Sequence, residues 1–216
     1  MSTEFINTHY YIISITILLL AIGAFFLSFE KRKPQAKEII TIAVMSAIAV
    51  ASRAAFMMLP FFKPMNAIVM ITGMAFGPCA GFLTGSLSAL VSNFIFGQGP
   101  WTPWQMLAYG IAGVLAGIMK KKSWITEEKP LQTGVVGLST VVVIVGPVLD
   151  TFSVFAMANV FSVKAIGAIY LSGLPVNVVH GVATFVTLYF LCKPMTEKLN
   201  RIKIKYGMMD GGENEI

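Results

Sequence analysis

The sequence predicts an all-α integral membrane protein, on three observations. Of its 216 residues, 56% are hydrophobic and only 12% are charged. Several apolar runs approach or exceed the ~20 residues that cross a hydrocarbon core of ~30 Å. These runs lack the alternating pattern of barrel strands, and in lipid only a helix satisfies its own backbone hydrogen bonds. We expect an N-terminal transmembrane helix in residues 1–30, a six-helix bundle in 31–200 and a cytoplasmic tail in 201–216.

The first apolar run covers about residues 10–29. The polar stretch before it contains Glu4 and His9 but lacks the basic region of a signal peptide, so we expect a transmembrane helix. Basic residues follow it, at Lys31 and beyond. Because cytoplasmic loops are enriched in Lys and Arg, the N-terminus should lie outside the cell.

Lysine and arginine lie in blocks between the apolar runs, although the net charge is +6. Thirteen of the 16 are in three blocks: Lys31, Arg32, Lys33, Lys37; Lys120, Lys121, Lys122, Lys129; and Lys193, Lys198, Arg201, Lys203, Lys205. This spacing indicates membrane topology rather than a nucleic-acid surface. We expect all three blocks, and the C-terminus, in the cytoplasm and no nucleic-acid partner.

The second run, about residues 38–59, repeats alanine every four residues, at Ala43, Ala47 and Ala51. Small residues at this spacing let another helix pack closely. At 100° per residue, Arg53 lies about 160° around the helix from Ala51. One face is therefore suited to a partner helix, and another carries a charge.

Five further apolar segments complete the predicted bundle, at about residues 66–76, 80–96, 104–119, 132–157 and 165–192. The first of these is short. Between them we expect an outer loop near Pro60 and a tight inner turn at Gly77-Pro78. Glycine and serine recur along the segments at close-packing positions. After the last span, the basic tail should fray.

Residues 97–105, Gly-Gln-Gly-Pro-Trp-Thr-Pro-Trp-Gln, interrupt the helical pattern. Glycine and proline fix a turn there. Trp101 and Trp104 offer flat rings with one donor each, and Gln98 and Gln105 offer donors and acceptors. The stretch is either an interfacial aromatic belt or the wall of a ligand site at the mouth of the bundle.

Three ionisable residues lie within predicted spans: Arg53, Asp150 and His180. A charge in the membrane is costly, so each needs a partner or a water-filled cavity. Arg53 and Asp150 either form an ion pair between two helices or line an outward-facing cavity. His180 is either an interhelical hydrogen-bonding residue or a ligand contact, and it shares a helical face with Asn177 and Thr184.

Polar groups therefore converge on the outer half of the bundle, where Asn93 also lies. The inner half contains small packing residues, and this asymmetry favours a binding pocket over a conduction path. The sequence has no phosphate-binding loop, zinc-protease motif or nucleophile elbow. Cys79 and Cys192 lack metal-binding or disulfide spacing. We expect no catalytic residue, no metal and no bound cofactor.

Four stretches of the sequence are distinctive. They are Lys31-Arg-Lys-Pro-Gln-Ala-Lys-Glu38 before the alanine repeat, Arg53-Ala-Ala-Phe56, Phe76-Gly-Pro-x-x-Gly-Phe82, and Gly97-Gln-Gly-Pro-Trp-Thr-Pro-Trp-Gln-Met106. Together they resemble the substrate-binding S components of energy-coupling factor (ECF) vitamin transporters, over about residues 33–195. The predicted helix at 10–29 is additional to that family's pattern.

The resemblance implies a six-helix S-component bundle that binds a vitamin from outside. It would dock on a T component carrying two cytoplasmic ATPases, so that only these partners use ATP. It implies that Ala43, Ala47 and Ala51 contact the T component and that the loop near residues 60–65 gates the ligand. A cobalamin-like or related corrinoid ligand is expected, although riboflavin or a modified purine would also stack on Trp. The expected location is the bacterial cell membrane.

The predicted ligand contacts are the polar and aromatic residues of the outer half: Arg53, Asn93, Gln98, Trp101, Trp104, Gln105, Asp150, Asn177 and His180.

Two other functions are open to such a chain. A stand-alone secondary carrier would need an ion site linking both halves, and the inner half lacks one; no internal repeat supports it either. An intramembrane enzyme would have to use His180 and Asp150. The S component is favoured over both.

Overall fold

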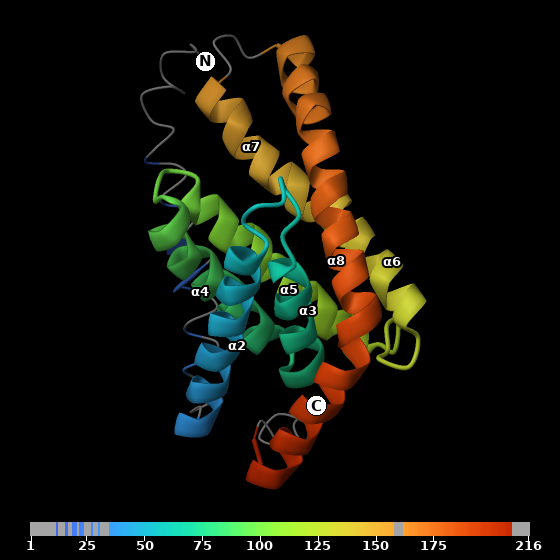
Figure 1. Cartoon of the computed structure of the whole chain (residues 1–216). Helices are drawn as coiled ribbons and strands as arrows, with labels where there is room; N and C mark the ends of the chain where they lie inside the picture. Colours follow the sequence, from blue (N-terminus) through green and yellow to red (C-terminus); the bar gives the residue numbers. More distant parts are fainter. Residues whose placement is uncertain are drawn as a thin grey trace.

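The computed structural model describes residues 35–157 and 162–208, and eight separate positions between Ile12 and Glu30. All regular secondary structure in these residues is helical, which confirms the predicted fold class. The elements are α2 (Ala36–Ala55), α3 (Met65–Phe76), α4 (Pro78–Phe96), α5 (Thr102–Lys121), α6 (Pro130–Thr140), the π-helix η1 (Val141–Val145), α7 (Gly146–Met157) and α8 (Val163–Tyr206) (Figure 1). Apart from seven of those positions, the span predicted at 10–29 lies outside the described residues.

Four helical stretches of the described chain are long and apolar enough to cross a membrane. They are α2, α4, the continuous run Pro130–Ala156, and α8. The segment predicted at 66–76 is a shorter apolar helix, α3. The segment predicted at 104–119 is α5, a helix of 20 residues. The structure therefore supports an integral membrane bundle.

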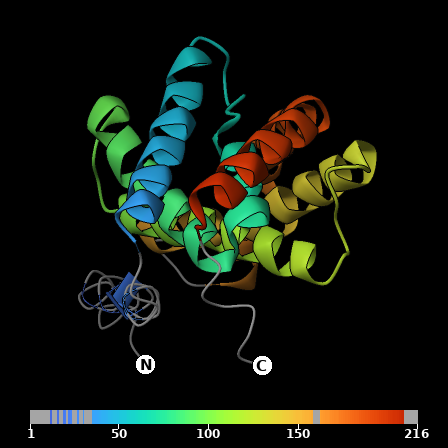
Figure 2. The same ribbon diagram turned by 90° about the horizontal axis from the view of Figure 1, so that it is seen from below.

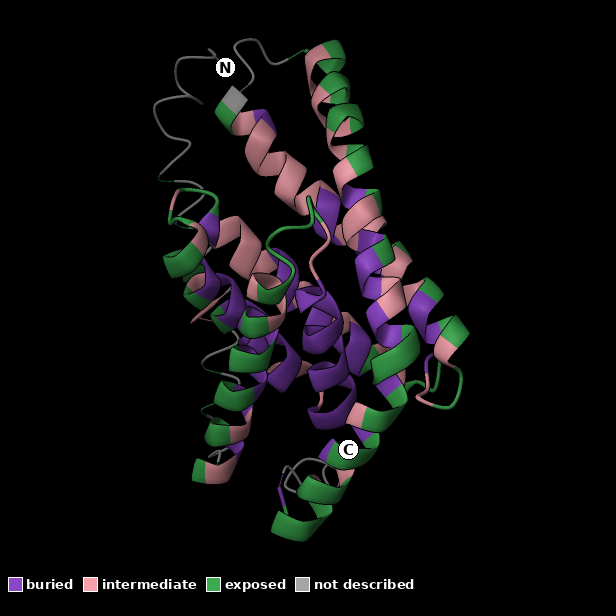
Figure 3. Ribbon diagram, viewed as in Figure 1, coloured by how far each residue is buried: buried purple, intermediate pink, exposed green. Residues whose placement is uncertain are grey.

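The short helix α3 is the core of the bundle. Every one of its 12 residues is buried, as the purple ribbon in Figure 3 shows. Figures 1 and 2 place it in the middle, with α2 on one side and α8 on the other. Neighbouring helices cover α3 on all sides. Its residues are accordingly almost all apolar, and it lacks the polar face of a surface helix.

Glycines let the backbones of α3, α4 and α5 come into contact. Close packing of this kind was expected from the small residues that recur along these segments. A Cβ on Gly81 would lie 2.6 Å from the carbonyl oxygen of Gly113 and 2.8 Å from Cα of Gly73. Between α3 and α4, Gly77 has φ of +90°, a conformation that only glycine adopts readily. Pro78 then occupies the first turn of α4. The tight turn predicted at Gly77-Pro78 is confirmed.

The segment predicted at 132–157 is one run, but it is not uniform. The five β-branched residues Val141–Val145 form a π-helical turn between α6 and α7. Such turns are rare and widen a helix locally. Periodicity alone did not predict it, because a π-turn keeps the apolar character of its neighbours.

The prediction of a frayed tail is wrong up to residue 206. Helix α8 continues through the basic run to Tyr206, and Gly207 ends it in the left-handed conformation, with φ of +54°. Lys37 Nζ donates a hydrogen bond to the carbonyl oxygen of Tyr206, and Met208 is buried. Contact with the start of α2 therefore orders this end, and the boundary predicted at residue 200 falls inside a helix.

Candidate functional site

The last turn of α2 is joined to α4 through Arg53. Its Nη1 donates hydrogen bonds to Ser92 Oγ at 2.5 Å and Asn93 Oδ1 at 2.9 Å. The guanidinium carbon lies 4.6 Å from the centroid of the Phe96 ring, a cation–π distance. Arg53 and Asp150 form no ion pair with each other, so that interpretation is wrong. The charge is instead stabilised by neutral groups of one neighbouring helix.

Asn93 is the centre of a hydrogen-bond network. Its side chain is 1% exposed, and its Nδ2 donates to Thr102 Oγ1 at 2.8 Å and to Gln105 Oε1 at 2.7 Å. Thr102 Oγ1 in turn donates to Gln98 Oε1 at 2.8 Å. Because Asn93 also accepts from Arg53, it connects α2, α4, the 97–101 loop and α5.

The two tryptophans of the aromatic loop turn toward α7. The ring of Trp101 lies 6.4 Å from that of Phe152, and the ring of Trp104 lies 6.3 Å from that of Phe155, centroid to centroid. Trp104 Nε1 is buried and has no hydrogen-bond partner among the described residues. An unpaired buried donor is costly and is a natural contact for a ligand. These contacts favour a ligand wall over an aromatic belt.

Helices α7 and α8 carry a second polar cluster. Asn177 Nδ2 donates to Asp150 Oδ2 at 2.8 Å, and the hydroxyls of Thr151 and Tyr170 lie 2.8 Å apart. Asn177 and Thr184 are buried and His180 is half-buried. The polar stripe predicted along this helix therefore faces the bundle interior.

The loop between α2 and α3 folds toward α8 (Figure 1). The rings of Phe61 and His180 lie 6.5 Å apart, edge to face. Lys63 Nζ donates to the carbonyl oxygens of Phe56, at 3.0 Å, and Leu59. Partial burial, followed by the charge of Arg53, lowers the pKa of Lys63 below its usual range. The loop thus brings a second cation close to Arg53.

These contacts form a closed chain at the end of the bundle that carries the α2–α3 loop and the 97–101 loop. It runs from α2 through α4, α5, α7 and α8 and returns through the α2–α3 loop, and each of the nine predicted contact residues lies on it or next to it. Sequence reasoning did not name seven members as ligand contacts: Phe61, Lys63, Ser92, Phe96, Thr102, Phe152 and Phe155. The sequence offers one indication for Lys63, which is an isolated cation in the predicted gating loop. The apolar rings had none, because sequence does not distinguish them from lipid-facing residues.

The alanine ridge lies on the outside of the bundle. Ala43, Ala47 and Ala51 are exposed, whereas Met45 and Ala49 are buried on the opposite face of α2. Arg53 faces α4, as its hydrogen bonds show. Among the described residues, α2 therefore presents the alanines on one face and Arg53 on another; the role of the alanine face in binding a partner stays a prediction.

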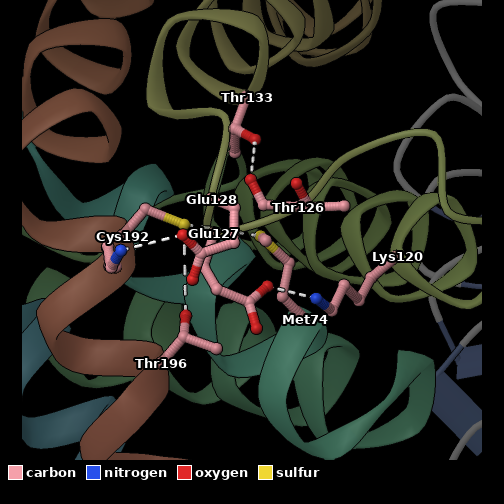
Figure 4. Close-up of polar contacts among 9 residues, drawn as sticks. Met74, Lys120, Thr126, Glu127, Glu128, Thr133, Cys192 and Thr196 are labelled. Atoms are coloured by element: carbon pink, nitrogen blue, oxygen red, sulfur yellow. Dashed lines mark hydrogen bonds and ion pairs between the residues drawn. The ribbon is translucent and has the colours of Figure 1, made fainter.

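The other end of the bundle is held by ion pairs around the α5–α6 loop. Lys120 pairs with Glu127, and Lys193 with Glu128 at 2.8 Å. Burial alone would raise the pKa of Glu127, but its hydrogen bonds and the charges of Lys120 and Lys193 outweigh burial and lower it. Beneath them Cys192 is buried against Met74 and Thr196 (Figure 4). This cysteine is a packing residue.

Comparison with known proteins identifies the family. The family model described as "ECF-type riboflavin transporter, S component" matches residues 33–197. A UPF0397 protein of Vibrio atlanticus (strain LGP32) is 31% identical over 88 residues, which cover 38% of this chain and 48% of the relative. The chain thus spans about half the length of that curated relative. No solved structure matches. Since the family match extends over most of the chain, the protein belongs to the family of ECF-type riboflavin transporter S components.

Proposed function

We propose that the protein captures a vitamin at the end of the bundle that carries the α2–α3 loop and delivers it to an ATP-driven ECF importer. The observation that carries the proposal is the closed chain of contacts, which gathers Arg53, Asn93 and the aromatic loop with Asp150, Asn177 and His180. Family membership supports a substrate-binding subunit rather than an enzyme.

The proposed ligand has a flat ring system. Trp101 and Trp104 each lie next to a phenylalanine of α7, and Trp104 Nε1 is a buried donor without a partner among the described residues. Aromatic rings stack on flat ligands, and a few polar groups then set orientation. A corrinoid is the ligand that the sequence resemblance favours, and riboflavin is the one that the family description names. Both are to be tested.

The proposed partner surface is the exposed alanine ridge of α2. Without large side chains at Ala43, Ala47 and Ala51, the backbone of this helix is open to close packing by another helix. We assign this face to a T component, which would carry two ATPases. The chain would then supply binding and specificity, and its partners would supply energy.

The test is co-expression of the chain with the T component and ATPases of the same organism, followed by native mass spectrometry and uptake assays. We expect a complex of all subunits with bound vitamin. Ala47→Trp should abolish the complex and uptake but retain binding of riboflavin or cyanocobalamin, whichever binds the wild type. Phe94→Trp, at a 75% exposed position of α4, is the control and should assemble normally.

Two results would contradict the proposal. One is normal assembly and uptake in Ala47→Trp. The other is ATP-independent uptake by the purified chain alone in vesicles, which would support the stand-alone carrier.

A further inference from the structure

We propose that the transported ligand carries an anionic oxygen group, a carboxylate or a phosphate, and that Arg53 and Lys63 bind it. The inference rests on the proposed function, because it concerns the ligand of the same site. It also separates the two candidate ligands, because cobalamin carries a phosphodiester, whereas riboflavin carries neither a carboxylate nor a phosphate. The inference therefore favours the corrinoid over riboflavin itself.

Two cations share one aromatic ring at this site. The Arg53 guanidinium carbon and Lys63 Nζ lie 4.6 Å and 5.9 Å from the centroid of the Phe96 ring. They come from different segments, the end of α2 and the α2–α3 loop. Like charges this close repel each other, more so where water is partly excluded. A site that holds them together is stabilised when an anion occupies it.

The protein supplies no carboxylate to either cation among the described residues. Arg53 donates to a hydroxyl and an amide oxygen, and Lys63 donates to backbone carbonyls. The sequence contains no acidic residue from 39 to 126, which includes nearly all of α2 and the whole of α3, α4 and α5. The described ion pairs lie at the opposite end, at Lys120 and Lys193. Asp150 accepts its hydrogen bond from Asn177 instead.

The guanidinium of Arg53 is held in a fixed orientation, but only part of its hydrogen-bonding capacity is used by the described residues. Both of its hydrogen bonds to described residues come from Nη1, whereas an arginine has five N–H donors in a planar fork. The contacts with Ser92, Asn93 and Phe96 fix that fork in place. A fixed arginine fork binds carboxylate or phosphate oxygens in pairs, and lysine adds a point charge. This is a preorganised anion site rather than a structural salt bridge.

His180 lies at the same end of the bundle as Arg53 and Lys63, next to the α2–α3 loop. Its ring contacts that of Phe61, two residues before Lys63, so the segment that carries Lys63 also packs on α8. Imidazole nitrogens add a further donor for an anionic oxygen. Closing of this loop over the ligand would therefore bring Lys63 toward the anion and complete its coordination.

The test uses inorganic phosphate and acetate as probes, with chloride at matched ionic strength as reference. Thermal unfolding of the detergent-solubilised chain is followed by tryptophan fluorescence. We expect phosphate, acetate or both to raise the midpoint above that in chloride, saturably, at millimolar concentration. A response to phosphate alone identifies a phosphorylated ligand, and a response to acetate alone identifies a carboxylate.

The variants Arg53→Gln and Lys63→Gln should each weaken the apparent anion affinity at least fivefold. Lys63 is in a loop, so its variant tests the site even if Arg53→Gln is poorly folded. Lys164→Gln, which removes an exposed cation at the start of α8, is the matched control and should respond like the wild type.

No difference between the probes and chloride in the wild type would overturn the inference, as would an equal response in all variants. Assembly with the T component is measured on the same preparations. Intact assembly without an anion effect contradicts only this inference, whereas failed assembly of the wild type contradicts the proposed function itself.

Discussion

Asn93 Oδ1 accepts a hydrogen bond from Arg53 Nη1 at 2.9 Å, so a buried amide holds the charged side chain of α2 in place. The same amide donates to Thr102 and Gln105 at the start of α5. The position of the guanidinium and the position of the aromatic loop are therefore set by one side chain. A change at Asn93 should affect both.

We expect Asn93→Ala to lower the stability of the chain by about 1–3 kcal/mol, because its three partners would be left with unsatisfied groups in a buried site. The measurement is the thermal unfolding midpoint in detergent. Phe94→Ala, at the exposed neighbouring position, is the control and should change the midpoint little. Equal midpoints for Asn93→Ala and the wild type would show that water replaces the amide.

We expect Gly113→Ala to destabilise the bundle by ~1–3 kcal/mol, since a Cβ there would lie 2.8 Å from Cα of Gly81 and closer still to its carbonyl. The backbones of α4 and α5 would have to separate. Gly167→Ala makes the same chemical change in α8, where a Cβ meets nothing within 4 Å. That control should be neutral or stabilising, because alanine favours helix over glycine. A tolerated Gly113→Ala would contradict the close approach of the two helices.

Much of this arrangement could be predicted from sequence, for physical reasons. Lipid imposes helices on apolar runs, so the class and approximate limits of α2, α4 and α5 followed from composition. The cost of a buried charge marked Arg53 and Asp150 as residues that need partners. Their actual partners, Asn93 and Asn177, depend on how helices rotate against each other. Spacing and composition do not give that rotation, so the interpretation of Arg53 and Asp150 as an ion pair is wrong.

The π-turn and the long C-terminal helix were missed for a different reason. Apolar periodicity is the same in a π-turn and an α-helix, so Val141–Val145 gave no signal. The basic run after Cys192 has the composition of a solvated tail. It is helical because its end contacts the start of α2, through Lys37 and Met208. Local sequence patterns do not predict contacts between segments that lie about 170 residues apart, as these do.

We expect Trp101→Ala to weaken vitamin binding by about 1–3 kcal/mol, if the ligand stacks between the aromatic loop and α7. Trp101 is 38% exposed, and its ring and that of Phe152 lie edge to face, so part of the Trp101 ring is accessible to a ligand. Affinity is measured by titration with riboflavin and cyanocobalamin. Trp124→Ala removes an exposed tryptophan of the α5–α6 loop, at the other end of the bundle, and should leave affinity unchanged. Unchanged affinity in Trp101→Ala would return the loop to the role of an interfacial belt.

The last prediction concerns acid stability at the α5–α6 loop. The pKa of Glu127 in the folded protein is lower than its ordinary value of 4.5. A carboxylate with a depressed pKa contributes stability that is fully present above its unfolded pKa and is lost as the pH falls through the folded pKa. We therefore expect the unfolding midpoint to decrease as the pH is lowered below about 4.5.

Glu127→Gln should reduce this acid-dependent decrease, because the neutral amide has no proton to gain. Lys120→Met should reduce it too, since Lys120 is the ion-pair partner that lowers the pKa. Glu197→Gln, which removes an exposed carboxylate of α8, is the matched control and should keep the wild-type slope. Midpoints measured from pH 6 downward give the comparison. If Glu127→Gln and the wild type lose stability in parallel, the ion pair at this end contributes nothing that acid can remove.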